Sequence, residues 1–373
     1  MTRELGVGIL GCGNISATYF SLAPLFRGLK VLACADINPA AATARAEEYG
    51  VTAQSVDELL QNDELDVIVN LTIPGAHYEM SKRILEAGKH VYSEKPLVLS
   101  VDEGKELGRI AAEKGLSVGC APDTFLGGAH QRARKYIDEG GIGRVTSGTC
   151  HVMSPGMEMW HPNPDFFFLP GGGPVLDLGP YYIANLINLI GPVKQVAALT
   201  SMANETRTIT SEPRRGEIIP VKTPTNIHAL LEFQNGATIS LSASWDVWVH
   251  RHSNMELYGT EGTLFVPDPN FFGGKVEAAG RDGKTSELDS QDHPFGKPNQ
   301  GERANYRTAG LADMAVALIE GRDARCSLAR ALHGVDVMAA ILKSGETGSF
   351  VTLSTTCTQP AALDAEAARA LLR

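Results

Sequence analysis

Short apolar runs alternate with helix-like stretches over the first third of the chain, from Leu5 to about Ala121. Between these runs, apolar residues recur at helical spacing. The apolar runs are Val7–Leu10, Val31–Ala35, Val67–Leu71, His90–Tyr92 and Ser117–Gly119. Runs that are apolar throughout are typical of parallel strands covered on both faces. The pattern therefore predicts a doubly wound parallel sheet, the Rossmann type of α/β domain, with capping boxes at Ser55 and Ser100 opening two of its helices.

The pattern changes after Ala121, where segments with alternating polarity follow one another without intervening helices. Such strands predict an α+β domain with a large, mostly antiparallel open sheet. The expected strands are 144–152, 227–233 and 237–245, and the expected helices are 128–139, 308–320 and 328–344. We therefore predict two domains, residues 1–121 and 122–373. The polar stretch Gly280 to Gly301 predicts a long surface loop, with a substrate lid as the alternative.

The composition narrows the functional classes. A chain of 373 residues exceeds the usual size of one domain, and 43% apolar with 20% charged residues is ordinary for a globular enzyme. The net charge of -10 opposes binding to nucleic acid or to an anionic membrane. Six scattered cysteines without CxxC spacing favour reduced thiols and no metal site. The early first strand leaves no room for a signal peptide, and no membrane-spanning run follows, so a cytoplasmic location is expected.

A glycine-rich turn follows the first expected strand. Gly11 and Gly13 can permit a tight turn, while Asn14 and Ile15 open a helix whose amino end would receive the pyrophosphate of a dinucleotide. Ser16 replaces the third glycine of the usual fingerprint, so the motif is weak alone. A turn chosen only for its geometry is the alternative.

Asp36 ends the second expected strand, about 20 residues after Ser16. At this spacing from the glycine-rich turn, a carboxylate binds the adenosine ribose hydroxyl groups of a dinucleotide. Its charge would repel a 2′-phosphate, and no arginine occurs in Ile37-Asn38-Pro39. NAD is therefore favoured over NADP as the cofactor. The alternative is that Asp36 only caps the next helix.

Four motifs strengthen this interpretation because they occur in one order across both halves of the chain. They are GCGNIS from Gly11, NLTIPGAHYE from Asn70, GKHVYSEKP from Gly88 and GGGPVLDLGPYY from Gly171. Together they resemble the Gfo/Idh/MocA oxidoreductases, the family of sugar and inositol dehydrogenases. The resemblance implies NAD-dependent oxidoreduction at CH–OH groups, with residues 1–121 binding NAD and residues 122–373 serving substrate binding and oligomerisation.

The same resemblance assigns further cofactor-binding residues. Thr72, Ile73 and Pro74 follow the fourth expected strand and would border the nicotinamide and its ribose. His77 could touch a ligand or equally fix the local turn. Glu94 would bind near the nicotinamide ribose, with a structural ion pair to Lys95 as the alternative.

Lys95 directly follows a strand and precedes Pro96, at the edge of the sheet where ligands bind. Hydride transfer from an alcohol requires loss of the hydroxyl proton, so a base and a cation should converge on that oxygen. The motif from Gly171 supplies Asp177 and Tyr181 at the start of a helix. The family usually has histidine at the latter position, and tyrosine resembles the glucose-fructose oxidoreductase and dihydrodiol dehydrogenase branches. A cation such as Lys95 would favour the phenolate of Tyr181.

The sequence says less about the substrate than about the cofactor. Asp177 would orient a substrate hydroxyl, and Lys95 and Tyr181 would also contact the substrate. Trp160 and His161, before the Phe166–Phe168 run, could line a sugar pocket, although such a run is more often core. Asp123 stands where many members of the family have a pocket residue.

Three functions remain open from the sequence. The leading one is a dehydrogenase acting on a secondary hydroxyl of a sugar, inositol or glycoside. The others are an NAD-dependent glycosidase that works by transient oxidation and elimination, and a catalytically silent cofactor-binding regulator. Lys95, Asp177 and Tyr181 argue against the regulator. The expected partners are a carbohydrate or polyol substrate and further copies of the chain, as a homodimer or homotetramer, because an open sheet face must be covered.

Overall fold

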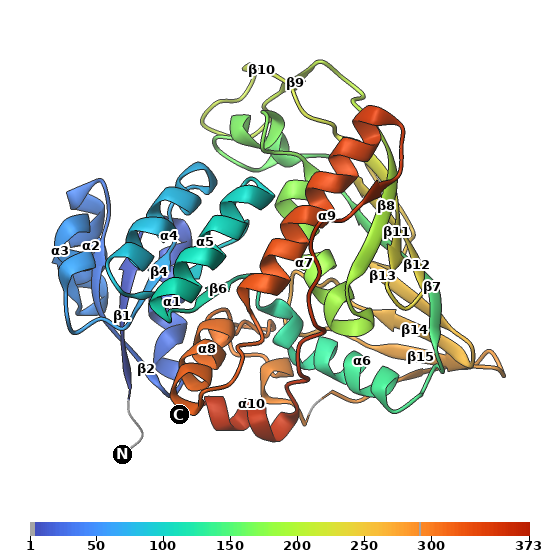
Figure 1. Cartoon of the computed structure of the whole chain (residues 1–373). Helices are drawn as coiled ribbons and strands as arrows, with labels where there is room; N and C mark the ends of the chain where they lie inside the picture. Colours follow the sequence, from blue (N-terminus) through green and yellow to red (C-terminus); the bar gives the residue numbers. More distant parts are fainter. Residues whose placement is uncertain (1–3, 291) are drawn as a thin grey trace. The chain divides into compact units, whose positions relative to one another are not determined.

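A computed structural model describes residues 4–290 and 292–373, and the chain forms two compact units (Figure 1). The first unit comprises Met1–Gly128, Gln291–Val335 and Pro360–Arg373; the second comprises Ala129–Ser290 and Asp336–Gln359. Each unit is therefore built from separate parts of the chain. The predicted domain boundary after residue 121 lies close to Gly128, where the first part of the first unit ends. The division into domains 1–121 and 122–373 stays a prediction.

The first unit contains a six-stranded sheet in the order β3-β2-β1-β4-β5-β6, with every neighbouring pair parallel. Its strands are β1 (Leu5–Leu10), β2 (Leu29–Ala35), β3 (Thr52–Gln54), β4 (Val67–Asn70), β5 (His90–Ser93) and β6 (Val118–Cys120). β1, β4 and β5 are apolar and buried along nearly their whole length, because helices cover both faces of a doubly wound sheet. The predicted Rossmann architecture is confirmed.

Two helices of the first unit begin at the capping boxes predicted from the sequence. Ser55 and Ser100 each accept a hydrogen bond from the glutamate N–H three residues later, so both capping boxes are formed. The α-helices are α1 (Asn14–Leu22), α2 (Pro39–Tyr49), α3 (Val56–Gln61), α4 (His77–Glu86), α5 (Val101–Lys114), α8 (Ala309–Glu320) and α10 (Ala365–Leu371). Short 3-10 helices are η1 (Ala23–Leu25), η2 (Pro74–Ala76), η3 (Thr124–Leu126) and η6 (Pro294–Gly296). α9 (Leu328–Thr347) starts in the first unit and ends in the second.

The second unit contains a nine-stranded sheet in the order β16-β15-β14-β13-β7-β12-β11-β8-β17. Only the β7–β12 pair is parallel among the described pairs of this sheet, so the predicted mostly antiparallel sheet is confirmed. The strands are β7 (Val145–Met153), β8 (Val193–Ser201), β11 (Asn226–Phe233), β12 (Thr238–Ser244), β13 (Met255–Gly259), β14 (Gly262–Val266), β15 (Glu277–Gly280), β16 (Thr285–Glu287) and β17 (Val351–Thr352). β9 (Thr206–Thr208) and β10 (Ile218–Pro220) form a separate pair.

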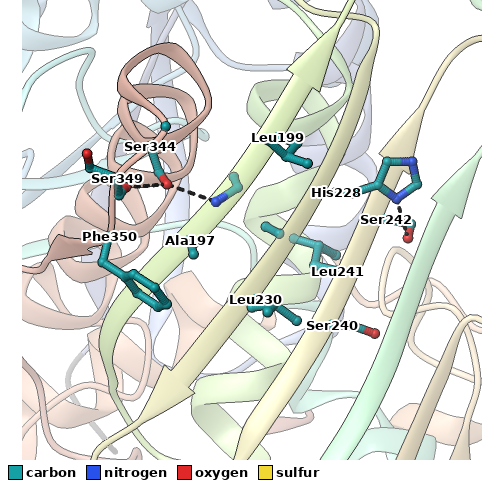
Figure 2. A pocket seen from close by; sticks show the side chains of 13 residues that line it. Ala197, Leu199, His228, Leu230, Ser240, Leu241, Ser242, Ser344, Ser349 and Phe350 are labelled. Atoms are coloured by element: carbon teal, nitrogen blue, oxygen red, sulfur yellow. Dashed lines mark hydrogen bonds between the residues drawn. The ribbon is translucent and has the colours of Figure 1, made fainter.

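One face of the large sheet carries the core of the second unit. α7 (Pro174–Ile190) lies against it with α6 (Gly128–Asp138) nearby (Figure 1). Ile183, Leu186 and Ile187 of α7 pack with inward residues of the strands, such as Leu231. Along β8 and β11 the alternate positions point outward, and there Leu199 and Leu230 are exposed (Figure 2). The sheet therefore has one buried and one open face.

The stretch from Gly280 to Gly301 departs from the predicted loop. It contains β16, which pairs with β15, and η6. All three side chains of β16 are exposed, so the strand has no apolar alternation that could reveal it. Among the described residues all six cysteines are free of disulfides, and no helix is long and apolar enough to cross a membrane.

Candidate active site

The glycine loop follows β1 and is shaped by close backbone contacts. Gly11 has φ +102°, and a Cβ atom on it would lie 2.6 Å from the carbonyl oxygen of Leu71. The N–H of Gly11 donates to the carbonyl of Ala35 across 2.8 Å. Only glycine fits this conformation and this space without strain, so the loop lies directly between the ends of β1, β2 and β4.

Gly13 is the N-cap of α1 and has no atom within 4 Å of the place where a Cβ would stand. No side chain among the described residues caps this helix, so the N–H groups of Asn14 and Ile15 at its amino end can face an anion. Ser16 is buried, and its hydroxyl donates to the carbonyl of Gly13 across 2.6 Å. The serine that replaces the third glycine is therefore accommodated in the packed turn.

Asp36 is half-buried at the end of β2. Its Oδ2 accepts from the N–H of Cys12 at 2.7 Å, and its Oδ1 accepts from the N–H of Asn38 at 2.8 Å. Each carboxylate oxygen can accept a second hydrogen bond, so the side chain is fixed beside the glycine loop with capacity for ribose hydroxyl groups. The N–H groups at the start of α1, the glycine loop and the carboxylate of Asp36 together fit a dinucleotide.

Two features beside Asp36 and the glycine loop were not found from the sequence. Ile37 is 95% exposed, so it offers apolar surface for a flat base. Arg45 of α2 reaches back to the loop, with Nη2 3.5 Å from the carbonyl oxygen of Gly13, and pairs with Glu48 at 2.6 Å. Arg45 lies six residues beyond Pro39 in the sequence, but it is close to the loop because it stands on the second turn of α2.

The loop after β4 is held by buried polar side chains. The Oδ1 of Asn70 accepts from the N–H of Thr72 at 3.2 Å and from its hydroxyl at 2.7 Å. The ring of His77 is enclosed, with 1% of its surface exposed, so it does not present an edge to a ligand. Thr72 is half-buried, while Ile73 and Pro74 are exposed at the tip of the loop.

Glu94 and Lys95 follow β5 directly and are both half-buried. Oε1 of Glu94 accepts from the hydroxyl of Tyr19 at 2.9 Å, and Oε2 accepts from the N–H of Lys95 at 3.1 Å. Tyr19 lies on α1 and is buried, and burial is the main cause that raises its pKa well above the ordinary value. Tyr19 therefore stays a neutral donor, a partner that the sequence did not reveal.

Asp123 is buried after β6 and binds the start of α8. Its Oδ2 accepts from the N–H groups of Thr308 and Gly310, each at 3.0 Å. Burial raises its pKa to about 6, although these N–H donors and the charge of Arg307 oppose the shift. Thr308 has φ +101°, a rare conformation for a residue with a side chain. The structure thus places the predicted substrate residue in a structural role, and a substrate contact stays a prediction.

Asp177 and Tyr181 lie in the first turns of α7, four residues apart and hence on one face of the helix. Gly173, with φ +98°, caps the helix, and its carbonyl accepts from the N–H of Asp177 at 3.1 Å. Tyr182 points elsewhere: its hydroxyl donates to the carbonyl of His151 at 3.2 Å, and burial raises its pKa. Both tyrosines are buried among the core residues of the second unit, Tyr181 with 8% and Tyr182 with 1% of its surface exposed.

The segment before α7 contains the remaining predicted substrate residues. Trp160 is 64% exposed, and its ring lies edge-on to His161 at 5.4 Å. Phe166 is exposed, whereas Phe168 is buried against Trp245, so the phenylalanine run is divided between surface and core. This segment is joined to the start of α7 by the N–H of Gly173, which donates to the carbonyl of Phe167 at 2.8 Å.

Asp165, beside that run, forms an ion pair with Arg214, and the charge-assisted hydrogen bonds lower its pKa. The hydroxyl of Ser211 donates to the carbonyl of His161 at 2.6 Å. Both contacts bind the segment that contains Trp160 to the residues before β10. The backbone that follows Trp160, whose ring is exposed, is therefore held at two points.

Comparisons with known proteins agree with this fold and loop chemistry. The model described as "Oxidoreductase family, NAD-binding Rossmann fold" matches residues 5–121, and "GFO/IDH/MocA C-terminal domain" matches residues 130–265. A levoglucosan dehydrogenase from Pseudarthrobacter phenanthrenivorans is 26% identical over 70% of this chain and 73% of its own length. A D-xylose dehydrogenase from Paenarthrobacter nicotinovorans is 25% identical over 58% of each chain, which is less than two thirds of its length.

A solved levoglucosan dehydrogenase in complex with NADH and levoglucosan has the same fold, with a TM-score of 0.78 and 23% identity over 95% of this chain and 100% of that one. The fold and the glycine loop define an NAD-binding oxidoreductase. The chain belongs to the Gfo/Idh/MocA family of oxidoreductases. The predicted class, an NAD(P)-dependent enzyme acting on CH–OH groups, is confirmed at that level, and so is the prediction of NAD as the cofactor.

Proposed function

We propose that the chain is an NAD-dependent dehydrogenase that oxidises a secondary hydroxyl group of a sugar, an inositol or a glycoside. This proposal rests on the position of Lys95. Lys95 follows β5 and lies at the same carboxyl edge of the parallel sheet as the glycine loop, which follows β1. Ligands of open α/β sheets bind at this edge. The names of two relatives, levoglucosan dehydrogenase and D-xylose dehydrogenase, support a carbohydrate substrate.

The chemistry requires that a proton leaves the reacting hydroxyl group. Bound NAD supplies the acceptor for the hydride. Tyr181 takes the proton through its phenol oxygen, and the ammonium group of Lys95 favours the phenolate form. Asp177 accepts a hydrogen bond from a substrate hydroxyl and orients the ring. Asp177 and Tyr181 share one face of α7, which supports a common role.

We further propose that NAD is preferred over NADP. The carboxylate of Asp36 is fixed by two backbone N–H groups beside the glycine loop, where a 2′-phosphate would meet its negative charge. Arg45 works in the other direction, because its guanidinium lies near the same loop, but Glu48 offsets its charge. The preference is therefore expected to be clear but not absolute.

The open face of the large sheet is proposed to bind a second copy of the chain. A groove of about 370 Å³ lies on this face. Its lining, drawn in Figure 2, includes the exposed side chains of Leu199, Leu230 and Phe350. Large apolar side chains gathered on one face mark an interaction site. A second copy presents the same face, so a two-fold axis would cover both grooves at once.

One screen tests the enzymatic proposal. The purified protein is mixed with NAD and each of a set of monosaccharides, inositols and glycosides, and reduced nicotinamide is followed by its absorbance. Net reduction with one of these compounds supports the dehydrogenase. Hydrolysis of a glycoside without net reduction would replace the proposal by the NAD-dependent glycosidase, and tight NAD binding without turnover on any compound would favour the regulator.

A further inference from the structure

The imidazole ring of His77 has an unusual pair of partners. Its Nδ1 lies 2.6 Å from the carbonyl oxygen of Pro96, and its Nε2 lies 2.9 Å from the carbonyl oxygen of Thr72. Both partners can only accept a hydrogen bond. His77 is 1% exposed, so bulk solvent does not reach either contact.

Two other buried histidines of the chain show the ordinary arrangement. His293 has one carbonyl partner, Leu363, at 2.9 Å, and accepts from the N–H of Phe295 at 3.2 Å. His130 faces the carbonyl of Phe271 at 2.8 Å and the side-chain amide nitrogen of Asn185 at 3.1 Å. In both cases one ring nitrogen donates and the other accepts, which suits a neutral ring.

A neutral ring cannot satisfy both contacts of His77. One nitrogen would carry no proton, and its lone pair would face a carbonyl oxygen at hydrogen-bond distance, which is repulsive. Burial and the amino end of α4 oppose a positive charge on this ring, whereas the two carbonyl oxygens favour it by charge-assisted hydrogen bonds. Within two residues of His77 and of its partner Pro96 in the sequence, the charged groups are Glu79 on α4, Glu94 and Lys95.

We propose that His77 is protonated on both ring nitrogens and acts as a positioning residue, which latches the loop after β4 to the segment that carries Lys95. The Nε2–H group holds Thr72, and the Nδ1–H group holds Pro96, the residue after Lys95. Asn70 reinforces the same loop, because its amide nitrogen donates to the carbonyl of His77 at 3.0 Å.

The proposal rests on the proposed function for its catalytic consequence. Thr72–Pro74 is the loop expected to border the nicotinamide, and Lys95 is expected to serve proton transfer. Catalysis depends on holding such groups within a fraction of an ångström, so one ring that binds both backbone segments sets their relative position. His77 itself is enclosed, so its role is to position these groups and not to touch the cofactor or the substrate.

The charge state is tested by a long-range proton–nitrogen correlation spectrum of the whole protein labelled with ¹⁵N-histidine. His77→Gln identifies the resonances of His77, and His130 and His293 serve as internal controls. We expect His77 to show two protonated ring nitrogens at neutral pH and both controls to show one. A single protonated nitrogen on His77 would overturn the proposal.

The positioning role is tested with His77→Gln and His77→Phe, with His293→Gln as the matched control in the same unit. NAD affinity, measured by fluorescence titration, should fall about tenfold in His77→Phe and less in His77→Gln, which keeps one side-chain donor group. On the substrate found by the screen, kcat should fall more than the substrate KM rises. Unchanged NAD affinity in a folded His77→Phe protein contradicts the latch. Neither the spectrum nor the titration needs a substrate, so failure of the proposed function leaves both results readable.

Discussion

The hydroxyl group of Tyr19 donates a hydrogen bond to Oε1 of Glu94 across 2.9 Å, although the two residues are 75 positions apart in the sequence. The contact ties α1, whose amino end is the expected pyrophosphate site, to the residue before Lys95. Glu94 thereby has partners on both oxygens, because its Oε2 accepts from the N–H of Lys95. The helix that follows the glycine loop and Lys95, the proposed catalytic lysine, are thus connected through the carboxylate of Glu94.

Tyr19→Phe should therefore weaken both stability and cofactor binding. The variant leaves a partly buried carboxylate oxygen without its donor, which costs about 1–3 kcal/mol of unfolding free energy. Urea denaturation and NAD titration measure the two effects. Tyr49→Phe is the control, since Tyr49 stacks on Phe20 and its ring remains. Equal behaviour of the two variants would mean that the Tyr19 hydroxyl has no special role.

Asp36→Ser should narrow the preference for NAD over NADP by about tenfold or more, because the charge that repels the 2′-phosphate is gone. Adding Arg45→Ala to that variant should weaken NADP binding again, since the nearby guanidinium favours a phosphate. Binding isotherms with both dinucleotides give the result. An unmodified protein that binds NADP more tightly than NAD contradicts the assignment of Asp36.

Lys95→Ala and Tyr181→Phe should each lower kcat by roughly 10²- to 10⁴-fold, the range of acid–base catalysis. The double variant should lose much less than the product of the two, because the residues act as one unit. Tyr182→Phe is the neighbouring control and should keep most of the activity. Normal turnover by Tyr181→Phe would show that Tyr181 only packs and that another group, such as His161, moves the proton.

Asp123→Asn should change how stability depends on pH. The pKa of Asp123 is raised from 3.8 to about 6 in the folded protein, so the folded state keeps a proton that the unfolded state releases between these values. Its contribution to stability is full below pH 3.8 and is lost as the pH rises through about 6. Asparagine can still accept from Thr308 and Gly310, so at neutral pH the variant should be more stable, by on the order of 3 kcal/mol at most.

Urea denaturation at several pH values checks this expectation. The difference in unfolding free energy between the variant and the parent should grow with pH across that window and level off above it. A difference that does not depend on pH would show that Asp123 keeps an ordinary pKa in the folded protein.

Leu230→Asp should dissociate the proposed oligomer, because a carboxylate on the open sheet face opposes burial against a second copy. Ile319→Asp, at an exposed apolar position on α8, is the control. Light scattering at micromolar concentration reports the mass of each variant. If the unmodified protein is already a monomer, the open face does not bind a second copy.

Much of the fold was predictable because it follows from local patterns. Buried parallel strands give continuous apolar runs, and the boxes at Ser55 and Ser100 mark helix starts. β3 and β16 were missed since their side chains are mostly exposed. The strand-end positions of Asp36 and Lys95 were predictable for the same reason as the strands themselves.

Contacts over long sequence separations were not predictable. Asp123 binds Thr308, which lies 185 positions away and returns to the first unit with Gln291–Val335. No pattern in the sequence marks that return. The enclosed ring of His77 likewise depends on how three backbone segments meet, whereas a motif shows only that a histidine is present.

The segment Pro360–Arg373 closes the first unit beside β2: the carbonyl of Leu371 accepts from the N–H of Arg27, and Nε of Arg373 donates to the carbonyl of Phe26, 347 positions away. Contacts of such separation form late, because the intervening chain must first be made and folded. On the ribosome the glycine loop and β1 emerge before the strands of the nine-stranded sheet, and Pro360–Arg373 emerges after them. The unit that binds the nucleotide therefore stays incomplete while that sheet is synthesised.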